Sequence, residues 1–364
     1  MAPHPRQFLE FYKKYVRFVP AVAFVLGFLF DIVMLTRIDD LLTIIQQAIY
    51  LLIIAALIGV ELINQVRTIT PPKFLKKVWI YREFALHFLI GSLLNTYVIF
   101  YFKSASGFVP FLFILTLLTA LTITEFKKFG ETQIIVHMTL MSLCLISYFE
   151  ALVPILLGFI GYFPFFLGLM VSGGFFYLFF QYLKPRMKDN AELLQTHVLM
   201  PFSATILGFA FLYLSHILPP IPLSVSYMGI YHEVEKKNGE FILSYTRPWW
   251  RFWEHGDESF YARPGDTLIG YAQVFSPGRF KDKLQIRWTS KNARGDWEPQ
   301  DAIPLEVSGG REEGFRIAVV KKNYHPGNWR VQIETTDNRE VGWLGYEIYE
   351  DKSTGPRELR KVTK

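Results

Sequence analysis

The chain has 364 residues, 51% of which are apolar, and a formal net charge of +6. That length is sufficient for two folded units. The charge excess lies in residues 1–218, which hold 16 Lys or Arg and 11 Asp or Glu, whereas residues 219–364 hold 22 and 21. A nucleic-acid-binding module needs its own basic surface, so we expect no nucleic-acid partner. The single cysteine, Cys144, excludes a disulfide within the chain.

Long apolar segments fill residues 1–218. A membrane-spanning helix needs about 20 mostly apolar residues. Seven segments approach that length, at 17–36, 41–63, 83–102, 108–124, 133–152, 162–182 and 194–216. We therefore predict an α-helical membrane bundle of about seven spans, with the lipid bilayer as its first partner. The junction at 152–164 also fits a re-entrant segment.

Basic residues alternate between the loops of this predicted bundle. Fourteen fall before the first span and in the second, fourth and sixth loops, and two, Arg37 and Lys103, fall in the other loops. Cytoplasmic loops collect Lys and Arg. The pattern therefore predicts a cytoplasmic amino terminus and a carboxy-terminal domain on the opposite side of the membrane.

Five ionisable residues lie near the predicted cytoplasmic ends of spans, and four of them, Glu61, His87, His137 and His197, are candidate metal ligands; the fifth is Glu83. Ionisable groups inside spans are costly and often functional. If these side chains converge, they suit zinc, iron or a proton relay. Each also lies within about two turns of a helix end, where interfacial water solvates it. No tight ligand spacing is present, so we favour this second interpretation and predict no cofactor.

A β pattern follows the helical one. Residues 219–226 contain three prolines, which cannot continue a helix, and predict a stiff exit from the membrane. Residues 227–350 alternate between apolar and polar positions and predict an immunoglobulin-like β-sandwich. Its strands are expected at 228–235, 240–246, 267–275, 284–289, 302–307, 314–321, 329–334 and 341–350. The polar and basic residues 351–364 predict a disordered tail.

Several sequence blocks of the β region occur together in one known family. They are Leu218 to Leu223, Gly229-Ile230-Tyr231-His232, Arg247-Pro248-Trp249-Trp250-Arg251-Phe252-Trp253, Arg263-Pro264-Gly265-Asp266 and Pro326-Gly327-Asn328-Trp329-Arg330-Val331. Through these blocks, residues 218–350 resemble bacterial membrane proteins that end in domain of unknown function 2914. The resemblance implies a bacterial multi-spanning protein with a small extracytoplasmic β-domain. Together with the loop charges, it predicts a protein of the inner (cytoplasmic) membrane whose β-domain, in a Gram-negative bacterium, lies in the periplasm. It implies no activity and no functional residues.

The segment 247–261 does not alternate and is predicted to be a loop. Its aromatic side chains have three interpretations: they fill the core or pack on the bundle, dip into the headgroup layer, or form a surface for a sugar or a protein. If the β-domain has a ligand or partner surface, we expect it at Trp249, Trp250, Arg251, Trp253 and His255.

Motifs for catalysis are missing from the sequence. It contains no Gly-x-Ser-x-Gly, no phosphate loop and no dinucleotide fingerprint. We therefore predict a non-enzymatic membrane protein whose β-domain binds an envelope protein, lipid or glycan. The alternative is a transporter or an intramembrane metal- or proton-dependent enzyme that uses Glu61, His87, His137 and His197. A third alternative is one subunit of a larger membrane complex.

Overall fold

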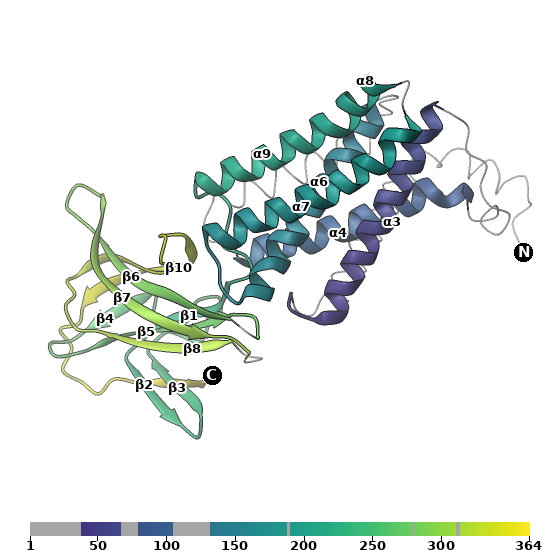
Figure 1. Ribbon diagram of the computed structural model, residues 1–364. Coiled ribbons are helices and arrows are strands. Elements are labelled where there is room, and N and C mark those ends of the chain that lie inside the picture. Colours follow the sequence, from purple (N-terminus) through teal and green to yellow (C-terminus); the bar gives the residue numbers. More distant parts are fainter. Residues whose placement is uncertain (1–37, 67–78, 105–131, 188–189, 279, 311–313) are drawn as a thin grey trace, which may run out of the picture. The chain divides into compact units, whose positions relative to one another are not determined.

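The computed structural model describes residues 38–66, 79–104, 132–187, 190–278, 280–310 and 314–364 (Figure 1). The chain divides into two compact units. The first is helical and ends at Leu218, and the second is rich in β-strands and begins at Pro219, with residues 154–161 also assigned to it.

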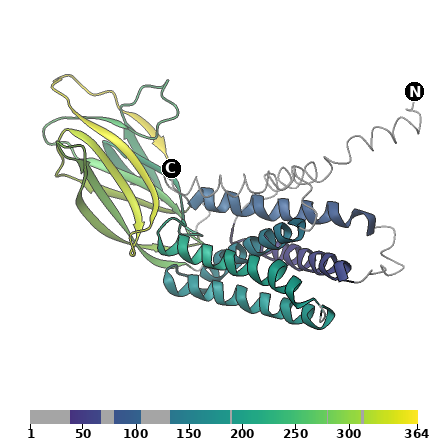
Figure 2. The ribbon, with the colours of Figure 1, turned by 90° about the horizontal axis from the view of Figure 1, so that it is seen from above.

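Five of the helical segments in the described residues are long and apolar enough to cross a membrane. The helices lie side by side (Figure 2). They are α3 (Leu41–Val66), α4 (Arg82–Ser104, after the 3-10 turn Trp79–Tyr81), α6 (Thr132–Leu157), α7 (Tyr162–Leu183) and the continuous run of α8 (Ala191–Leu194), a π-helical turn (Gln195–Leu199) and α9 (Met200–Leu214).

These five segments coincide with five of the seven predicted spans. The predicted spans at 17–36 and 108–124 lie outside the described residues, so the count of seven stays a prediction. Residues 152–164 form the end of α6, a turn and the start of α7.

Close contacts join neighbouring helices. Phe165 of α7 stacks on Tyr213 of α9 with 3.6 Å between ring centroids, and Phe176 stacks on Phe202 at 3.8 Å. Gly168 of α7 leaves room for the Glu150 side chain of α6, because a Cβ at position 168 would lie 2.7 Å from Glu150 Oε1. Large aliphatic and aromatic side chains cover the outside of the helices, among them Leu42, Leu52, Met170, Leu178, Leu207 and Phe211.

The described residues of the β unit form eleven strands. Their bounds are β1 (Ser224–Tyr231), β2 (Glu233–Lys237), β3 (Glu240–Tyr245), β4 (Ser259–Ala262), β5 (Leu268–Phe275), β6 (Lys281–Lys291), β7 (Trp297–Ser308), β8 (Phe315–Lys321), β9 (Gly327–Thr335), β10 (Glu340–Glu350) and β11 (Arg360–Thr363). Three sheets result, with strand orders β1-β5-β8, β4-β10-β9-β6-β7 and β11-β3-β2. Neighbouring strands are antiparallel except β4 and β10, which are parallel.

One hydrophobic core is shared by the first two sheets. Alternate residues of β6, Leu284, Ile286 and Trp288, point into it, as the period of two predicts. Trp329 of β9 is also buried there, and its indole N–H donates to the His325 carbonyl oxygen at 2.8 Å. Gly270 of β5 lies against the Trp288 ring, where a Cβ would approach to 2.9 Å. The immunoglobulin-like topology stays a prediction.

Four expectations differ from the observed strands. Residues 224–226 of the predicted exit belong to β1, and residues 259–261 of the predicted loop belong to β4. The predicted strand 228–235 is broken at His232, where the chain leaves the first sheet as β1 and enters the third as β2. The predicted disordered tail is wrong for residues 360–363, which form β11 and pair with β3. Val362 explains this, because it packs on a small apolar cluster around Tyr231, Leu243 and Tyr271.

Candidate functional site

The loop between β3 and β4 is closed at its base by a buried carboxylate. Asp257 accepts hydrogen bonds from the Thr246 backbone N–H at 2.9 Å and from the Thr246 hydroxyl at 3.1 Å. Its own backbone N–H donates to the Ile230 carbonyl oxygen of β1 at 2.8 Å. Gly256 makes this approach feasible, because its φ of +77° and its lack of a side chain bring the loop against Ile230. Residues 246–257 therefore form a loop with a fixed base.

Two successive tight turns form the tip of this loop. The Arg251 N–H donates to the Pro248 carbonyl oxygen, and the Glu254 N–H donates to the Arg251 carbonyl oxygen, both at 3.2 Å. Four large side chains of the tip are exposed: Trp249, Trp250, Phe252 and Trp253. They are therefore not part of the core of the β unit. The interpretation that these aromatic side chains fill that core is excluded.

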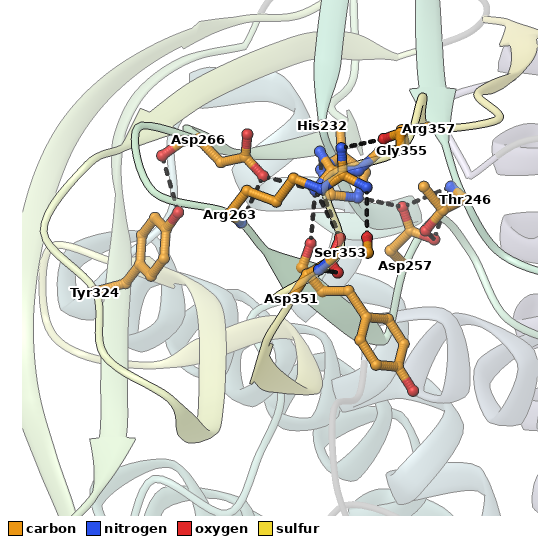
Figure 3. Close-up of polar contacts among 11 residues, drawn as sticks. His232, Thr246, Asp257, Arg263, Asp266, Tyr324, Asp351, Ser353, Gly355 and Arg357 are labelled. Atoms are coloured by element: carbon orange, nitrogen blue, oxygen red, sulfur yellow. Dashed lines mark hydrogen bonds and ion pairs between the residues drawn. The ribbon is translucent and has the colours of Figure 1, made fainter.

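A polar network joins the loop base to the carboxy-terminal segment (Figure 3). Arg357 lies 3.1 Å from His232 Nδ1, and it also donates to the Tyr261 carbonyl oxygen and to Asp266. A guanidinium can only donate, so His232 Nδ1 is the acceptor and the imidazole carries its proton on Nε2. That nitrogen faces the Asp257 carboxylate at 3.4 Å.

Burial shifts both titrating groups of this network. Burial and the adjacent Arg357 charge lower the pKa of His232 to about 4. Burial also raises the pKa of Asp257 to about 6, although hydrogen bonds from Thr246 act in the opposite direction. Both side chains are nearly inaccessible, at 3% and 1% exposure. At neutral pH His232 is therefore uncharged, and Asp257 is an anion close to its titration range.

A cavity of about 370 Å³ lies beside this network. Arginine and carboxylate groups line it together with the apolar surfaces of Pro248 and Tyr261. Its charged lining residues are Arg247, Arg251, Arg357, Glu254, Asp257, Asp351 and Glu358. Below we call it the arginine pocket.

Arg247 is distinct among the cations of the arginine pocket. Arg251 pairs with Glu254 at 3.4 Å, and Arg357 pairs with Asp266 at 2.8 Å. By contrast, Arg247 Nε and Nη1 are buried and have no hydrogen-bond partner among the described residues. A second cavity, of about 530 Å³, lies next to Arg263 and Tyr324, and no described lining side chain there has a buried unpaired polar atom. The arginine pocket is therefore the stronger candidate site.

The same residues are poorly arranged for hydrolysis. In a nucleophilic triad the imidazole lies between the nucleophile and the carboxylate. Here Asp257 lies between Thr246 and His232, and His232 Nδ1 is occupied by Arg357. The Ser259 hydroxyl accepts a hydrogen bond from Arg251 at 3.3 Å. These contacts favour ligand binding over covalent catalysis.

The predicted surface residues divide between the tip and the base of the loop. Trp249, Trp250 and Trp253 lie on the exposed tip, and Arg251 lines the arginine pocket. His255 stacks on Tyr227 of β1 with 4.6 Å between ring centroids.

Arg247, Asp257, His232 and Arg357 were not among the predicted site residues. Of these four residues, only Arg247 and Asp257 are near each other in sequence, ten residues apart in the same loop, and that proximity is the only signal the sequence contains. Arg357 was assigned to a disordered tail and gave no signal.

Three of the four polar residues predicted within the spans come together. Glu61 Oε2 lies 3.0 Å from His137 Nδ1, and the rings of His87 and His137 are 5.2 Å apart. His87 Nδ1 donates to the Glu83 carbonyl oxygen at 2.8 Å. His197 instead lies 2.9 Å from the Thr196 hydroxyl. Within the described residues, no group of three or more His, Cys, Asp or Glu side chains is arranged to hold a metal ion.

One protein-family model matches part of the chain. It is described as "Protein of unknown function (DUF2914)" and covers residues 281–348, from β6 to most of β10. The resemblance is thereby supported for the last five strands before the tail. The blocks between Leu218 and Asp266 lie outside the matched residues. No curated protein matches the chain.

Solved structures give weak similarities. A β-glucosidase from Kluyveromyces marxianus aligns at 13% identity and TM-score 0.19, over 26% of this chain and 14% of that one. A β-glucosidase from Listeria innocua in complex with glucose aligns at 14% identity and TM-score 0.19, over 32% and 16%. The alkylpurine DNA glycosylase AlkC from Pseudomonas fluorescens aligns at 9% identity and TM-score 0.22, over 86% and 99%. This chain spans less than a fifth of the two β-glucosidases, and no functional conclusion is drawn from similarities of this size.

Proposed function

We propose that this chain is a non-enzymatic integral membrane protein of the bacterial inner membrane, with a cytoplasmic amino terminus. A bundle of about seven helices anchors an immunoglobulin-like β unit in the periplasm. The β unit binds an envelope component (a protein, a lipid or a glycan) at the arginine pocket. The five long apolar helices and the apolar side chains on their outer surfaces support the membrane anchor.

Two buried N–H groups of Arg247, at Nε and Nη1, carry the binding proposal, because neither has a hydrogen-bond partner among the described residues. Leaving a buried charged donor without a partner is costly. Arg247 Nε and Nη1 are buried donors of this kind. Arg247 also lines a cavity large enough for a small polar group. A ligand oxygen that accepts from Arg247 would remove this cost. We therefore expect the bound group to carry an oxyanion or a cluster of hydroxyls.

Other lining residues of the arginine pocket can donate hydrogen bonds to a ligand or accept them from it. Arg251 and Glu254 form one wall, and the Tyr261 ring, which stacks on Tyr349 at 5.2 Å, forms another. A flat apolar surface beside paired charged groups suits a sugar ring or a headgroup. The proposal therefore includes both glycans and lipids along with acidic protein segments.

Thermal shift measurements on the full-length protein in lipid nanodiscs would test this function. Three separate probes represent the candidate classes: soluble peptidoglycan fragments, glycerol phosphate and an extract of periplasmic proteins. We expect at least one probe to raise the melting temperature of the wild type. Arg247→Gln should weaken that probe's binding about tenfold to a hundredfold, since hydrogen bonds to charged groups contribute about 1.5–3 kcal/mol.

The matched control is Arg294→Gln. Arg294 lies in the exposed turn between β6 and β7, so this variant removes one guanidinium outside the pocket. It should respond to the probes as the wild type does. The proposal is wrong if every probe that shifts the wild type shifts Arg247→Gln equally.

A proton relay in the helical unit is the second candidate function. The specific observation is the Glu61–His137–His87 group. The Nδ1 atoms of His87 and His137 are held by a carbonyl oxygen and a carboxylate, respectively. A proton can pass between the Glu61 carboxylate and the His137 ring, because Glu61 Oε2 and His137 Nδ1 lie 3.0 Å apart.

Proteoliposomes containing a pH-sensitive dye distinguish this second candidate. If it is right, the wild type moves protons and Glu61→Gln does not. Glu83→Gln is the control, because Glu83 binds His87 through its backbone oxygen, which the substitution keeps. Absence of proton movement in the wild type, together with absence of bound metal in the purified protein, would contradict the relay.

A further inference from the structure

The tip of the β3–β4 loop carries an unusual concentration of exposed aromatic side chains. Below, residues 248–253 are called the aromatic tip. Trp249 is 76% exposed and Phe252 78% exposed, with Trp250 at 49% and Trp253 at 59%. Large aromatic side chains are usually buried because each removes a large apolar area from water. Four of them on one six-residue segment therefore point to something outside the β unit that covers them.

Three of the four side chains, Trp250, Phe252 and Trp253, are joined by ring contacts, and Trp249 directly precedes Trp250 in the chain. The Trp253 ring lies 5.2 Å from Phe252 and 6.1 Å from Trp250. None of the four belongs to the core shared by the first two sheets, which is filled by residues of the strands. The rings of Trp250, Phe252 and Trp253 therefore form an exposed apolar patch, of the kind that marks an interaction surface.

Contacts within the β3–β4 loop hold the aromatic tip in place. The Arg251 guanidinium lies 5.0 Å from the Trp250 ring, and it also pairs with Glu254 at 3.4 Å. The Thr246–Asp257 hydrogen bonds close the base of the loop. Because the loop is ordered before it meets a partner, little conformational entropy is lost on contact.

A lipid surface fits the composition of this tip. Tryptophan is enriched at the level of lipid headgroups, since its ring is apolar and its indole N–H is polar. Arg247 directly precedes the tip and Arg251 lies within it, and both carry charges that match lipid phosphates. Exposed aromatic side chains are also typical of surfaces that bind proteins. The short chain connection between α9 and β1 favours the lipid surface over a protein partner.

Connectivity keeps the β unit near the end of α9. Nine residues, 215–223, join Leu214 of α9 to Ser224 of β1. At about 3.3–3.6 Å per residue this connection cannot exceed about 30 Å. If α9 crosses the bilayer, as the proposed function holds, the lipid surface is always available to the β unit at high effective concentration.

We propose that the aromatic tip inserts into the headgroup layer of the same bilayer that holds the helical unit. Trp249 and Phe252, the most exposed residues, enter deepest. The inserted tip places the arginine pocket next to the membrane surface. This inference rests on the membrane anchoring in the proposed function and does not depend on which ligand fills the pocket.

Spin labels measure the insertion directly. The full-length protein with Cys144→Ser receives one new cysteine at a time, as Trp249→Cys, Phe252→Cys or the control Arg294→Cys, and a nitroxide is attached. In nanodiscs of phosphatidylethanolamine and phosphatidylglycerol, we expect the labels at 249 and 252 to collide more with oxygen than with a water-soluble nickel chelate. The label at 294 should show the opposite. Chelate accessibility at 249 and 252 equal to that at 294 overturns the inference.

A second measurement avoids the cysteine variants. Brominated lipids quench tryptophan that lies in the bilayer, so part of the intrinsic fluorescence of the wild type should be quenched. Trp249→Ser/Trp253→Ser should lose part of the quenched fraction. Trp297→Ser is the control, because Trp297 is a partly exposed tryptophan of β7 outside the tip. Equal quenched fractions in both variants would contradict insertion.

The outcomes separate this inference from the proposed ligand binding. If the labels remain accessible to the chelate in lipid and become protected only when periplasmic protein extract is added, the occupant is a protein and lipid insertion is wrong. The effect of Arg247→Gln on probe binding is read in a different assay. Loss of insertion with intact probe binding would therefore remove this inference alone.

Discussion

Arg357, seven residues from the carboxy-terminal residue of the chain, donates a hydrogen bond to Nδ1 of His232 at the junction of β1 and β2. The same guanidinium binds Asp266 and the Tyr261 carbonyl oxygen. The carboxy-terminal segment thus forms one wall of the arginine pocket. It is also held by β11, whose strand pairs with β3.

Removing the Arg357 charge should raise the pKa of His232. Burial is the largest cause of the lowered pKa and the adjacent guanidinium is the second, so without Arg357 the Asp266 carboxylate, which raises the pKa, is opposed only by burial and by the Arg263 charge. We expect Arg357→Gln to move the His232 titration upward from about 4. Histidine NMR of the labelled full-length protein measures it, with His232→Gln used to assign the signal.

The same substitution should destabilise the β unit. The substitution removes three hydrogen bonds of the guanidinium, to His232, the Tyr261 carbonyl oxygen and Asp266, and we expect a loss of about 1–3 kcal/mol in unfolding free energy. Lys361→Gln removes a cation from β11 that makes none of these contacts, and its melting temperature should stay close to that of the wild type. Equal melting temperatures for the two variants would contradict the role of Arg357.

His232 and Asp257 should give opposite dependences of stability on pH. The pKa of His232 falls from 6.5 to about 4 on folding, so its contribution is present above pH 6.5 and is lost as the pH falls towards 4. The pKa of Asp257 rises from 3.8 to about 6, so its folded state gains stability as the pH falls from about 6 towards 3.8. In the wild type these two dependences largely cancel.

Single substitutions separate the two dependences. With Asp257→Asn, the β unit should lose stability between pH 6.5 and 4, because only the histidine shift remains. With His232→Gln, it should gain stability over about the same range, because only the aspartate shift remains. Melting temperatures at several pH values, each compared with the wild type, measure both slopes. Slopes of the same sign in the two variants would show that the shifts are misassigned.

Gly256→Ala should be more harmful than Gly239→Ala. Both glycines have positive φ, +77° and +86°, so each substitution forces a left-handed alanine at a cost of about 1–2 kcal/mol. Only at Gly256 would the new Cβ also collide with the Ile230 carbonyl oxygen, at 2.2 Å, whereas nothing lies within 4 Å at Gly239. Unfolding of both variants by heat or denaturant provides the comparison, and similar losses would show that the loop base relaxes.

The proposed orientation predicts which sites are labelled in intact cells. Arg294→Cys in the β unit should react with a membrane-impermeant maleimide, because it would lie in the periplasm. Lys184→Cys, which follows α7 at the predicted cytoplasmic side, should react only after the membrane is permeabilised. The native Cys144 is fully buried and should stay silent in both variants. The reverse pattern would place the amino terminus outside.

The helices, the buried faces of strands and several turns of this protein could be predicted from its sequence. Apolar runs of about 20 residues marked five helices of the described bundle because a spanning segment must be apolar along its whole length. Period-two alternation placed Leu284, Ile286 and Trp288 on one buried face, since successive side chains of a strand point to opposite sides. Turns such as Asn238-Gly239 separated neighbouring strands for similarly local reasons.

The residues of the candidate site are brought together only by tertiary contacts, which the sequence did not predict. His232 and Arg357 are 125 residues apart in sequence, and no periodicity indicates that they meet. The strand break at His232 follows from a change of sheet, which depends on the partners β5 and β3 rather than on the residues of the strand itself. The carboxy-terminal segment is placed in part by Val362, which packs on a cluster formed by residues of β1, β3 and β5. Contacts of this kind are set by packing between elements, so the arginine pocket became visible only in three dimensions.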